Sequence, residues 1–319
     1  MANNAPLNIF VTGGTTSVGR EACRQAKARG HNVTVLTEGS EGAVKARQDG
    51  ALPTYSDVTR AGELRSLFQM AQTDVVLHLA AQLCNGFPVK GGYETHERMM
   101  AESAQAVVSA AITAGVKFIV YASFASVYGD AHGEWLTEDD HGHEERALRP
   151  ALAAEQHIMA SGVPACVLRA GFNYGEDDVA VRDVADHIMQ GRPLYLGDSH
   201  TVLNWIHAAD LASAAVLAAE QQPAGQTFNV VNDNPTSASA FASQLATGLG
   251  VPSPVGDQIT GFRAQRATSE MQRLLLATSA RLKNDKAKSV LGWTPRYPDI
   301  QSGIDQMLLG WRASAPVKV

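Results

Sequence analysis

Short apolar runs alternate with longer amphipathic stretches along the first half of the chain. The runs predict strands at residues 8–12, 32–36, 74–79, 118–121 and 165–169, and the stretches between them predict helices that include residues 18–29, 98–114 and 152–161. Continuous apolar strands are typical of a parallel sheet that helices cover on both faces. Because parallel strands need long crossovers, the pattern predicts a doubly wound α/β fold.

The regular alternation weakens after about residue 172. Clusters of glycine, proline and polar residues interrupt it at residues 191–193, 221–225 and 251–256. We therefore predict a main domain of residues 1–171, to which residues 200–222 return. Residues 172–199 and 223–319 are predicted to form a smaller C-terminal lobe that binds substrate.

Composition removes several classes of function. The net charge is −6, no basic stripe is present, and no apolar run is long enough to span a bilayer. The three cysteines, Cys23, Cys84 and Cys166, are scattered and form no metal-binding or disulfide pattern. We therefore expect a cytoplasmic protein with a small-molecule substrate and with neither nucleic acid nor membrane as a partner.

A glycine-rich turn follows the first predicted strand. In such a strand–turn–helix unit, glycine permits a tight turn and the helix N-terminus faces the pyrophosphate of a dinucleotide. Thr15, Thr16 and Ser17 in this turn carry hydroxyls that can donate to a phosphate. An ordinary strand-to-helix turn is the alternative. The predicted cofactor-binding residues here are Gly13, Thr15, Thr16, Ser17, Val18 and Gly19.

Five further segments complete a family resemblance with this turn. They are Asp57-Val58, the run from Asp74 to Gln82, the run from Ala114 to Gly129, the run from Trp205 to Ala212, and Leu291-Gly292-Trp293. Together they resemble the extended short-chain dehydrogenase/reductases, the NAD-dependent epimerase/dehydratase group. The resemblance implies a Rossmann-type sheet and NAD as the cofactor. It also places Thr16 at the family's middle glycine, where its side chain either intrudes on the pyrophosphate or offers it a hydroxyl. It adds Asp57, Val58, Leu79, Ala80, Ala81 and Gln82 to the predicted cofactor-binding residues.

The choice between NAD and NADP depends on Glu38. A carboxylate at the end of the second strand accepts hydrogen bonds from the ribose and repels a 2′-phosphate. Family members usually place an aspartate at the position of Thr37, so Glu38 comes one residue late. NAD is predicted, and NADP stays open.

The catalytic triad of the family is missing. Its serine or threonine, tyrosine and lysine correspond here to Phe124, Ala147 and Ala151, and residues 129–156 contain neither tyrosine nor lysine. The catalytic residues are therefore unknown. Ser123 and Tyr128 are the nearest remaining hydroxyls, although a tyrosine at the position of Tyr128 is usually structural.

Substrate-side positions depart from the family as well. Phe172 replaces an asparagine, and Leu203 replaces an arginine that binds diphosphate in nucleotide-sugar members. A smaller or more apolar ligand is therefore expected. The predicted substrate-binding residues are Ser123, Phe124, Phe172 and Asn173.

Histidines suggest other chemistry without establishing it. His141 and His143 lie in an acidic loop where a metal site or a hydrolytic triad with Ser123 is conceivable, but the loop lacks a defined third ligand and no metal is predicted. His78 and His207 are interpreted as structural.

The sequence thus describes an atypical NAD-binding family member that acts on an unknown small carbonyl, hydroxyl or sugar-like substrate. The alternative is a non-catalytic nucleotide-binding sensor or scaffold. A homodimer is also expected, because the resemblance implies pairing through two helices, one of which carries Ala147, Ala151, Ala153 and Ala154.

Overall fold

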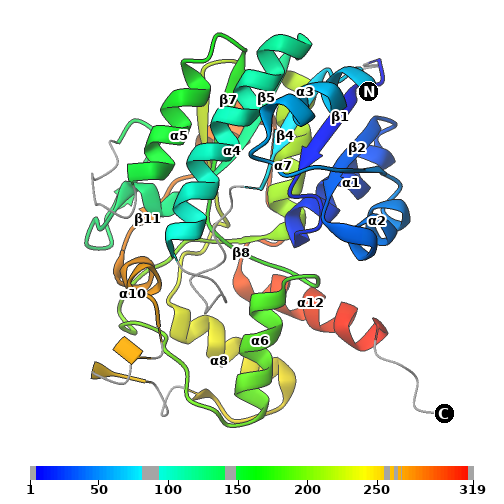
Figure 1. The fold of residues 1–319 in the computed structure, drawn as a ribbon. Coiled ribbons are helices and arrows are strands. Elements are labelled where there is room, and N and C mark those ends of the chain that lie inside the picture. The colour runs from blue at the N-terminus through cyan, green and yellow to red at the C-terminus, as the bar shows by residue number, and fades with distance from the viewer. Residues whose placement is uncertain are drawn as a thin grey trace, which may run out of the picture.

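The central sheet has seven strands. They are β1 (Asn8–Thr12), β2 (Asn32–Thr37), β3 (Leu52–Tyr55), β4 (Val75–His78), β5 (Phe118–Phe124), β7 (Ala165–Ala170) and β10 (Gln226–Val230). Every pairing is parallel, and the order is β10-β7-β5-β4-β1-β2-β3. The computed structural model describes residues 5–80, 93–140, 149–254, 259–261, 265–266 and 268–314. The predicted doubly wound, Rossmann-type fold is confirmed (Figure 1).

Helices cover both faces of this sheet. One face is covered by α3 (Ala61–Met70), α4 (Tyr93–Ala114) and α5 (Arg149–Met159). The other is covered by α1 (Ser17–Ala28), α2 (Gly39–Gln48), α7 (Ala208–Gln221) and α11 (Asp285–Leu291). Each face has its own apolar core, so the strands are buried on both sides, as their continuous apolar runs predict. Among the described residues, no helix combines the length and apolarity needed to cross a bilayer.

A third apolar core lies beyond the carboxyl ends of the strands (Figure 1). It is formed by α6 (Val179–Met189), α8 (Ala238–Leu249) and α12 (Ile300–Ser314), together with β8 (Phe172–Tyr174) and β9 (Trp205–His207), which pair in parallel. The indole of Trp205 stacks on the ring of Phe241, with 4.3 Å between ring centroids. Nearby lie α10 (Glu270–Ala277) and a second two-stranded ribbon of β6 (Trp135–Leu136) and β11 (Arg281–Leu282).

One placement differs from the sequence prediction. Residues 223–319 were assigned to the smaller lobe, yet β10 is an edge strand of the main sheet, and Trp293 belongs to the core between the sheet and α7. The physical reason is that Phe228 and Val230 are fully buried once β10 pairs with β7. The remaining division into two parts stays a prediction.

Asp210 ties this C-terminal return to α7. Its carboxylate accepts the backbone N–H groups of Arg296 (2.7 Å) and Tyr297 (2.9 Å), and its carbonyl accepts the indole N–H of Trp293 (3.0 Å). The side chain is buried, and burial raises the pKa of Asp210 to about 6. The raised pKa means that the folded protein binds a proton here more tightly than the unfolded chain does.

The raised pKa of Asp210 predicts a specific dependence of stability on pH. Because the unfolded carboxyl loses its proton first, this group lowers the free energy of unfolding as pH rises from about 4 to about 6, by on the order of 2–3 kcal/mol. Asp210→Asn removes that titration and also costs one amide hydrogen bond. Urea unfolding at pH 4–8 should therefore show a wild-type minus variant difference that falls across this interval. Parallel curves for the two proteins would contradict the assignment.

Candidate functional site

The glycine-rich turn packs directly against the carboxyl end of β4. Gly13 has φ +71°, and a Cβ added to it would lie 2.8 Å from the backbone of Ala80. A Cβ on Gly19 would collide with the carbonyl oxygen of Gly13. These two positions therefore require glycine, one for its backbone conformation and both for the close approach of chain segments.

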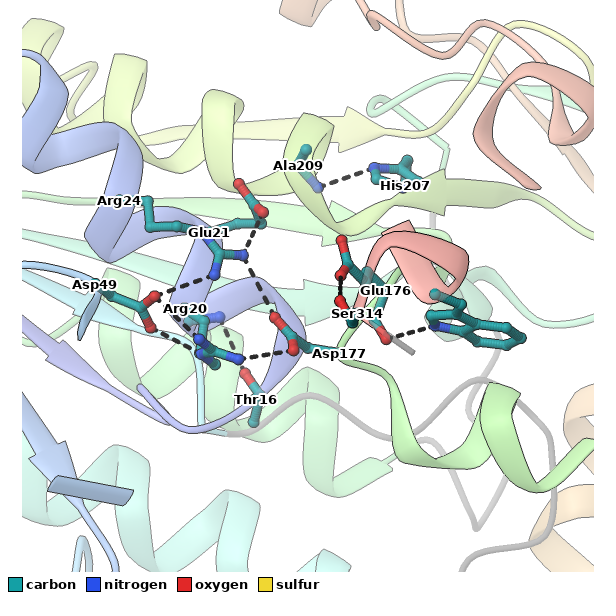
Figure 2. Close-up of polar contacts among 12 residues, drawn as sticks. Thr16, Arg20, Glu21, Arg24, Asp49, Glu176, Asp177, His207, Ala209 and Ser314 are labelled. Atoms are coloured by element: carbon teal, nitrogen blue, oxygen red, sulfur yellow. Dashed lines mark hydrogen bonds and ion pairs between the residues drawn. The ribbon is translucent and has the colours of Figure 1, made fainter. Parts of the chain in front are cut away.

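Thr16 does not intrude on the space in front of the helix. It is the N-cap of α1: its hydroxyl accepts the N–H of Gly19 (3.0 Å; Figure 2). The same hydroxyl donates to the carbonyl of Gly13 (2.8 Å). The side chain is thus folded into the turn. By helix geometry, the N–H groups of Ser17 and Val18 have no partner within the helix, which leaves them as donors for an anion at this end of α1.

A cavity of about 610 Å³ opens beside the turn. Seven of the predicted cofactor-binding residues line it: Gly13, Thr15, Thr16, Glu38, Asp57, Val58 and Ala80. Leu79 is fully buried, and Ser17, Val18 and Gly19 are buried at the start of α1. Ala81 and Gln82 lie outside the described residues.

Sequence reasoning missed part of this lining. Leu36, Thr37, Ser56 and Thr59 flank residues that were predicted, so their proximity in sequence was an available signal. Met99 and Glu102 come from α4, and no motif in the sequence indicates that this helix reaches the cavity. The missed residues are Leu36, Thr37, Ser56, Thr59, Met99 and Glu102.

Thr37 and Glu38 have different surroundings. Thr37 is buried, and its hydroxyl donates to the carbonyl of Thr54 in the neighbouring strand (3.1 Å). Glu38 is exposed, precedes α2 and makes no side-chain hydrogen bond to that helix. The hydroxyl of Thr37 is thus used within the sheet, whereas Glu38 lines the cavity. Glu38 therefore places a carboxylate on the cavity wall at the end of β2.

Two of the three positions that the family resemblance assigns to the catalytic triad lie among the described residues, and both carry apolar side chains. Phe124 ends β5 and is mostly buried, and Ala151 is fully buried in α5 as part of the same apolar core. Ala147 lies outside the described residues. Ser123 is 1% exposed, and its hydroxyl has no hydrogen-bond partner within the part of the chain that the structure describes.

The surroundings of Tyr128 disfavour a role as a proton donor or acceptor. Its hydroxyl donates to the side-chain oxygen of Asn229 (2.8 Å), and the guanidinium of Arg169 lies 4.6 Å from its ring centroid. Arg169 is in turn paired with the buried carboxylate of Glu155 (2.8 Å). Burial raises the pKa of Tyr128 to about 12, whereas proton exchange near neutral pH requires a lowered tyrosine pKa. Its contacts favour a structural role.

The histidines in the strand motifs are also held within the fold. His78 is fully buried between the hydroxyls of Thr12 (2.7 Å) and Ser103 (3.2 Å), and burial lowers its pKa to about 4. His207 caps α7 by accepting the N–H of Ala209 (3.2 Å), and burial lowers its pKa to about 4 as well. His141 and His143 lie outside the described residues, among which no group of three histidine, cysteine or acidic side chains is placed to hold a metal.

The predicted substrate side is largely apolar. Phe172 and Leu203 line a cavity of about 10 Å³, roughly the size of one water molecule, together with Ala125, Ser126, Gly129, Asn204, Thr278 and Ala280. The amide of Asn204 is engaged by the carbonyl of Ala280 (3.0 Å) and the N–H of Leu282 (2.9 Å). Asn173 is buried, and Ser123 and Phe124 are absent from this lining. The structure therefore does not gather all four predicted residues around this cavity.

The fold and the glycine turn define an α/β protein with a dinucleotide-type site. The family model described as the NAD dependent epimerase/dehydratase family matches residues 9–231. The chain belongs to that family, whose members are extended short-chain dehydrogenase/reductases.

Relatives within the family differ in their activities. The chain is 27% identical, over 93% of its length and 99% of the relative, to a 3-diazoavenalumate denitrifying reductase from Streptomyces sp. It is 25% identical, over 94% and 96%, to a 4-hydroxy-2-methyl-3-oxo-4-farnesyl-3,4-dihydroquinoline-1-oxide ketoreductase from Stigmatella aurantiaca. A UDP-glucose 4-epimerase complex with NAD from Thermus thermophilus superposes with a TM-score of 0.78, at 21% identity and 96% and 99% coverage.

The cap at Thr16 predicts a stability difference between two conservative variants. Thr16→Ala removes the oxygen that accepts the Gly19 N–H and should lower the free energy of unfolding by about 1 kcal/mol. Thr16→Ser keeps that oxygen and should lie within about 0.5 kcal/mol of the wild type. Denaturant unfolding of the three proteins measures the difference. Equal losses for alanine and serine would show that the hydroxyl does not cap the helix.

Proposed function

We propose that the chain binds NAD in the cavity between the glycine turn, Glu38 and Asp57. The carrying observation is the turn itself: glycine at residues 13 and 19 permits its close packing, and Thr16 caps α1 without blocking it. In this arrangement the amides of Ser17 and Val18 receive the pyrophosphate. The volume of about 610 Å³ suits the adenosine half of a dinucleotide.

The other contacts of the cofactor follow from its position. The carboxylate of Glu38 accepts hydrogen bonds from the hydroxyls of the adenosine ribose. Asp57 and Val58 contact the adenine. The side chain of Asp57 is oriented by its own turn, since it accepts both the N–H (2.9 Å) and the hydroxyl (2.8 Å) of Thr59. Ala80, two residues beyond the end of β4, lines the same cavity. When NAD is bound, its nicotinamide supplies or accepts a hydride.

Glu38 supports NAD over NADP. Its carboxylate is exposed on the cavity wall, so a 2′-phosphate placed there meets a like charge. Among the described residues that line this cavity, none is a lysine or arginine that could pair with that phosphate.

We infer that the activity is that of a reductase acting on a small, largely apolar substrate. Leu203 and Phe172 offer no charge for a diphosphate, and none of the described residues that line the small cavity between them has a titratable side chain. Two relatives in the comparison are named as reductases, which agrees with this lining better than a nucleotide-sugar substrate does.

The missing triad narrows the class of substrate further. Reduction of a ketone leaves an oxygen that needs a proton, and a general acid typically contributes 10²–10⁴-fold in rate. An aryl diazonium ion needs no such proton: a hydride forms the new C–H bond, the C–N bond breaks, and N₂ leaves with its electron pair. The diazo compound in the name of the Streptomyces relative makes this acceptor class our preferred assignment.

Cofactor binding is tested by calorimetric titration with NAD⁺, NADH, NADP⁺ and NADPH. Micromolar binding of the NAD pair is expected, with the NADP pair at least tenfold weaker. Glu38→Gln should narrow that preference, because it keeps the shape of the side chain and removes its charge. Failure of all four ligands to bind would overturn the proposed function.

The acceptor class is tested by NADH consumption with an aryl diazonium salt and with the matched aryl aldehyde. Turnover of the first and not of the second is expected above the rate without enzyme. Tyr128→Phe should lower kcat by less than threefold, since the hydroxyl of Tyr128 donates a hydrogen bond to Asn229 and takes no part in the reaction. A loss of 100-fold or more in a folded variant would make Tyr128 the proton donor and refute this assignment. Binding of NADH without any turnover would favour a non-catalytic sensor.

The predicted homodimer receives no support from the alanine pattern. Ala151 and Ala154 are buried within the chain's own core, so that face of α5 is already occupied. The dimer stays a prediction.

A further inference from the structure

Three consecutive acidic residues follow β8, and each contacts a different helix. Glu176 lies against α12: its carbonyl accepts the indole N–H of Trp311 (2.8 Å), and its carboxylate accepts the hydroxyl of Ser314 (3.1 Å). Asp178 caps α6 by accepting the N–H of Val181 (3.0 Å). Asp177, between them, turns toward α1 (Figure 2).

Asp177 meets α1 through Arg20. One guanidinium nitrogen of Arg20 donates to Asp177 (2.7 Å), while the other two nitrogens donate to Asp49 at the end of α2 (2.8 and 3.1 Å). Arg24, one turn further along α1, contacts both carboxylates more weakly (3.1 Å to Asp49 and 3.4 Å to Asp177). The two arginines thus hold Asp177 against the first two turns of α1.

The ion pair is partly shielded from solvent. The exposed fractions of the Arg20, Asp49 and Asp177 side chains are 14%, 4% and 28%. A planar guanidinium that is engaged by carboxylates on both sides has little freedom to rotate. The guanidinium of Arg20 is therefore held between Asp177 and Asp49.

Arg20 and Asp177 also lie next to the two functional segments. Arg20 follows Gly19 directly, and Gly19 donates to the cap at Thr16. Asp177 is three residues beyond the end of β8, the strand that carries Phe172 and Asn173. Phe172 itself packs against both the core over α4 and α5 and the core of the C-terminal lobe. The ion pair of Arg20 with Asp177 therefore connects the start of α1 to the segment that follows β8. β8 itself lies between the two apolar cores that Phe172 contacts.

We propose that Arg20 and Asp177 are positioning residues that couple cofactor occupancy of the glycine turn to the placement of β8. The inference rests on the proposed function, because it requires NAD to bind at the N-terminus of α1. An anion bound there restrains the first turn of α1, and Arg20 passes this restraint through Asp177 to the segment of residues 172–178. Glu176 and Asp178 anchor the same segment to α12 and α6, which gives the matched control.

Hydrogen–deuterium exchange with and without saturating NAD⁺ tests the proposal. In the wild type, NAD⁺ should slow exchange at least threefold in peptides covering both residues 13–20 and residues 172–182. In Asp177→Ala, only the first peptide should be protected. Glu176→Ala removes the neighbouring carboxylate, which contacts α12, and should behave like the wild type. Asp177→Glu keeps the charge and should restore part of the protection at residues 172–182.

The outcomes separate the two proposals. Absence of protection at residues 13–20 in the wild type refutes NAD binding at the turn, and the coupling falls with it. Protection at the turn without any at residues 172–182 refutes the coupling alone. Equal protection of residues 172–182 in Asp177→Ala and the wild type shows that another contact carries the restraint. Thermal unfolding of each variant confirms that the exchange is measured on folded protein.

Discussion

The contact between the glycine turn and the end of β4 is the constraint on which the site depends. Gly13 approaches the backbone of Ala80 so closely that no side chain fits between them, and this approach fixes where α1 starts relative to the sheet. The cap at Thr16 then sets the direction of the first helical turn. The cavity wall, the free amides and the position of Arg20 all follow from that one packing arrangement.

The proposed cofactor side and the proposed substrate side of the site differ in character. Phe124 and Ala151 replace groups that the family resemblance assigns to proton transfer, and both are buried in an apolar core. Tyr128 is held by Asn229 and Arg169 in surroundings that disfavour its ionisation. For these reasons we propose an acceptor that takes a hydride and needs no proton from the protein.

Much of the fold could be predicted because its strands are short continuous apolar runs separated by long crossovers. The strands at β1, β2, β4, β5 and β7 were located within a few residues of their ends. β3 was missed because Leu52-Pro53-Thr54-Tyr55 is half exposed at the sheet edge and lacks an apolar run. β10 was assigned to the wrong part of the molecule because its pairing with β7 is a long-range contact that no local pattern reports. For the same reason the contributions of Met99 and Glu102 to the cavity could not be foreseen.

A crystal structure of the protein with NAD⁺ tests the proposed site most directly. We expect the pyrophosphate against the amides of Ser17 and Val18, the adenosine ribose beside Glu38, and the hydroxyl of Thr16 still bonded to Gly19. A pyrophosphate that displaces the Thr16 cap, or a dinucleotide bound elsewhere on the chain, would contradict it.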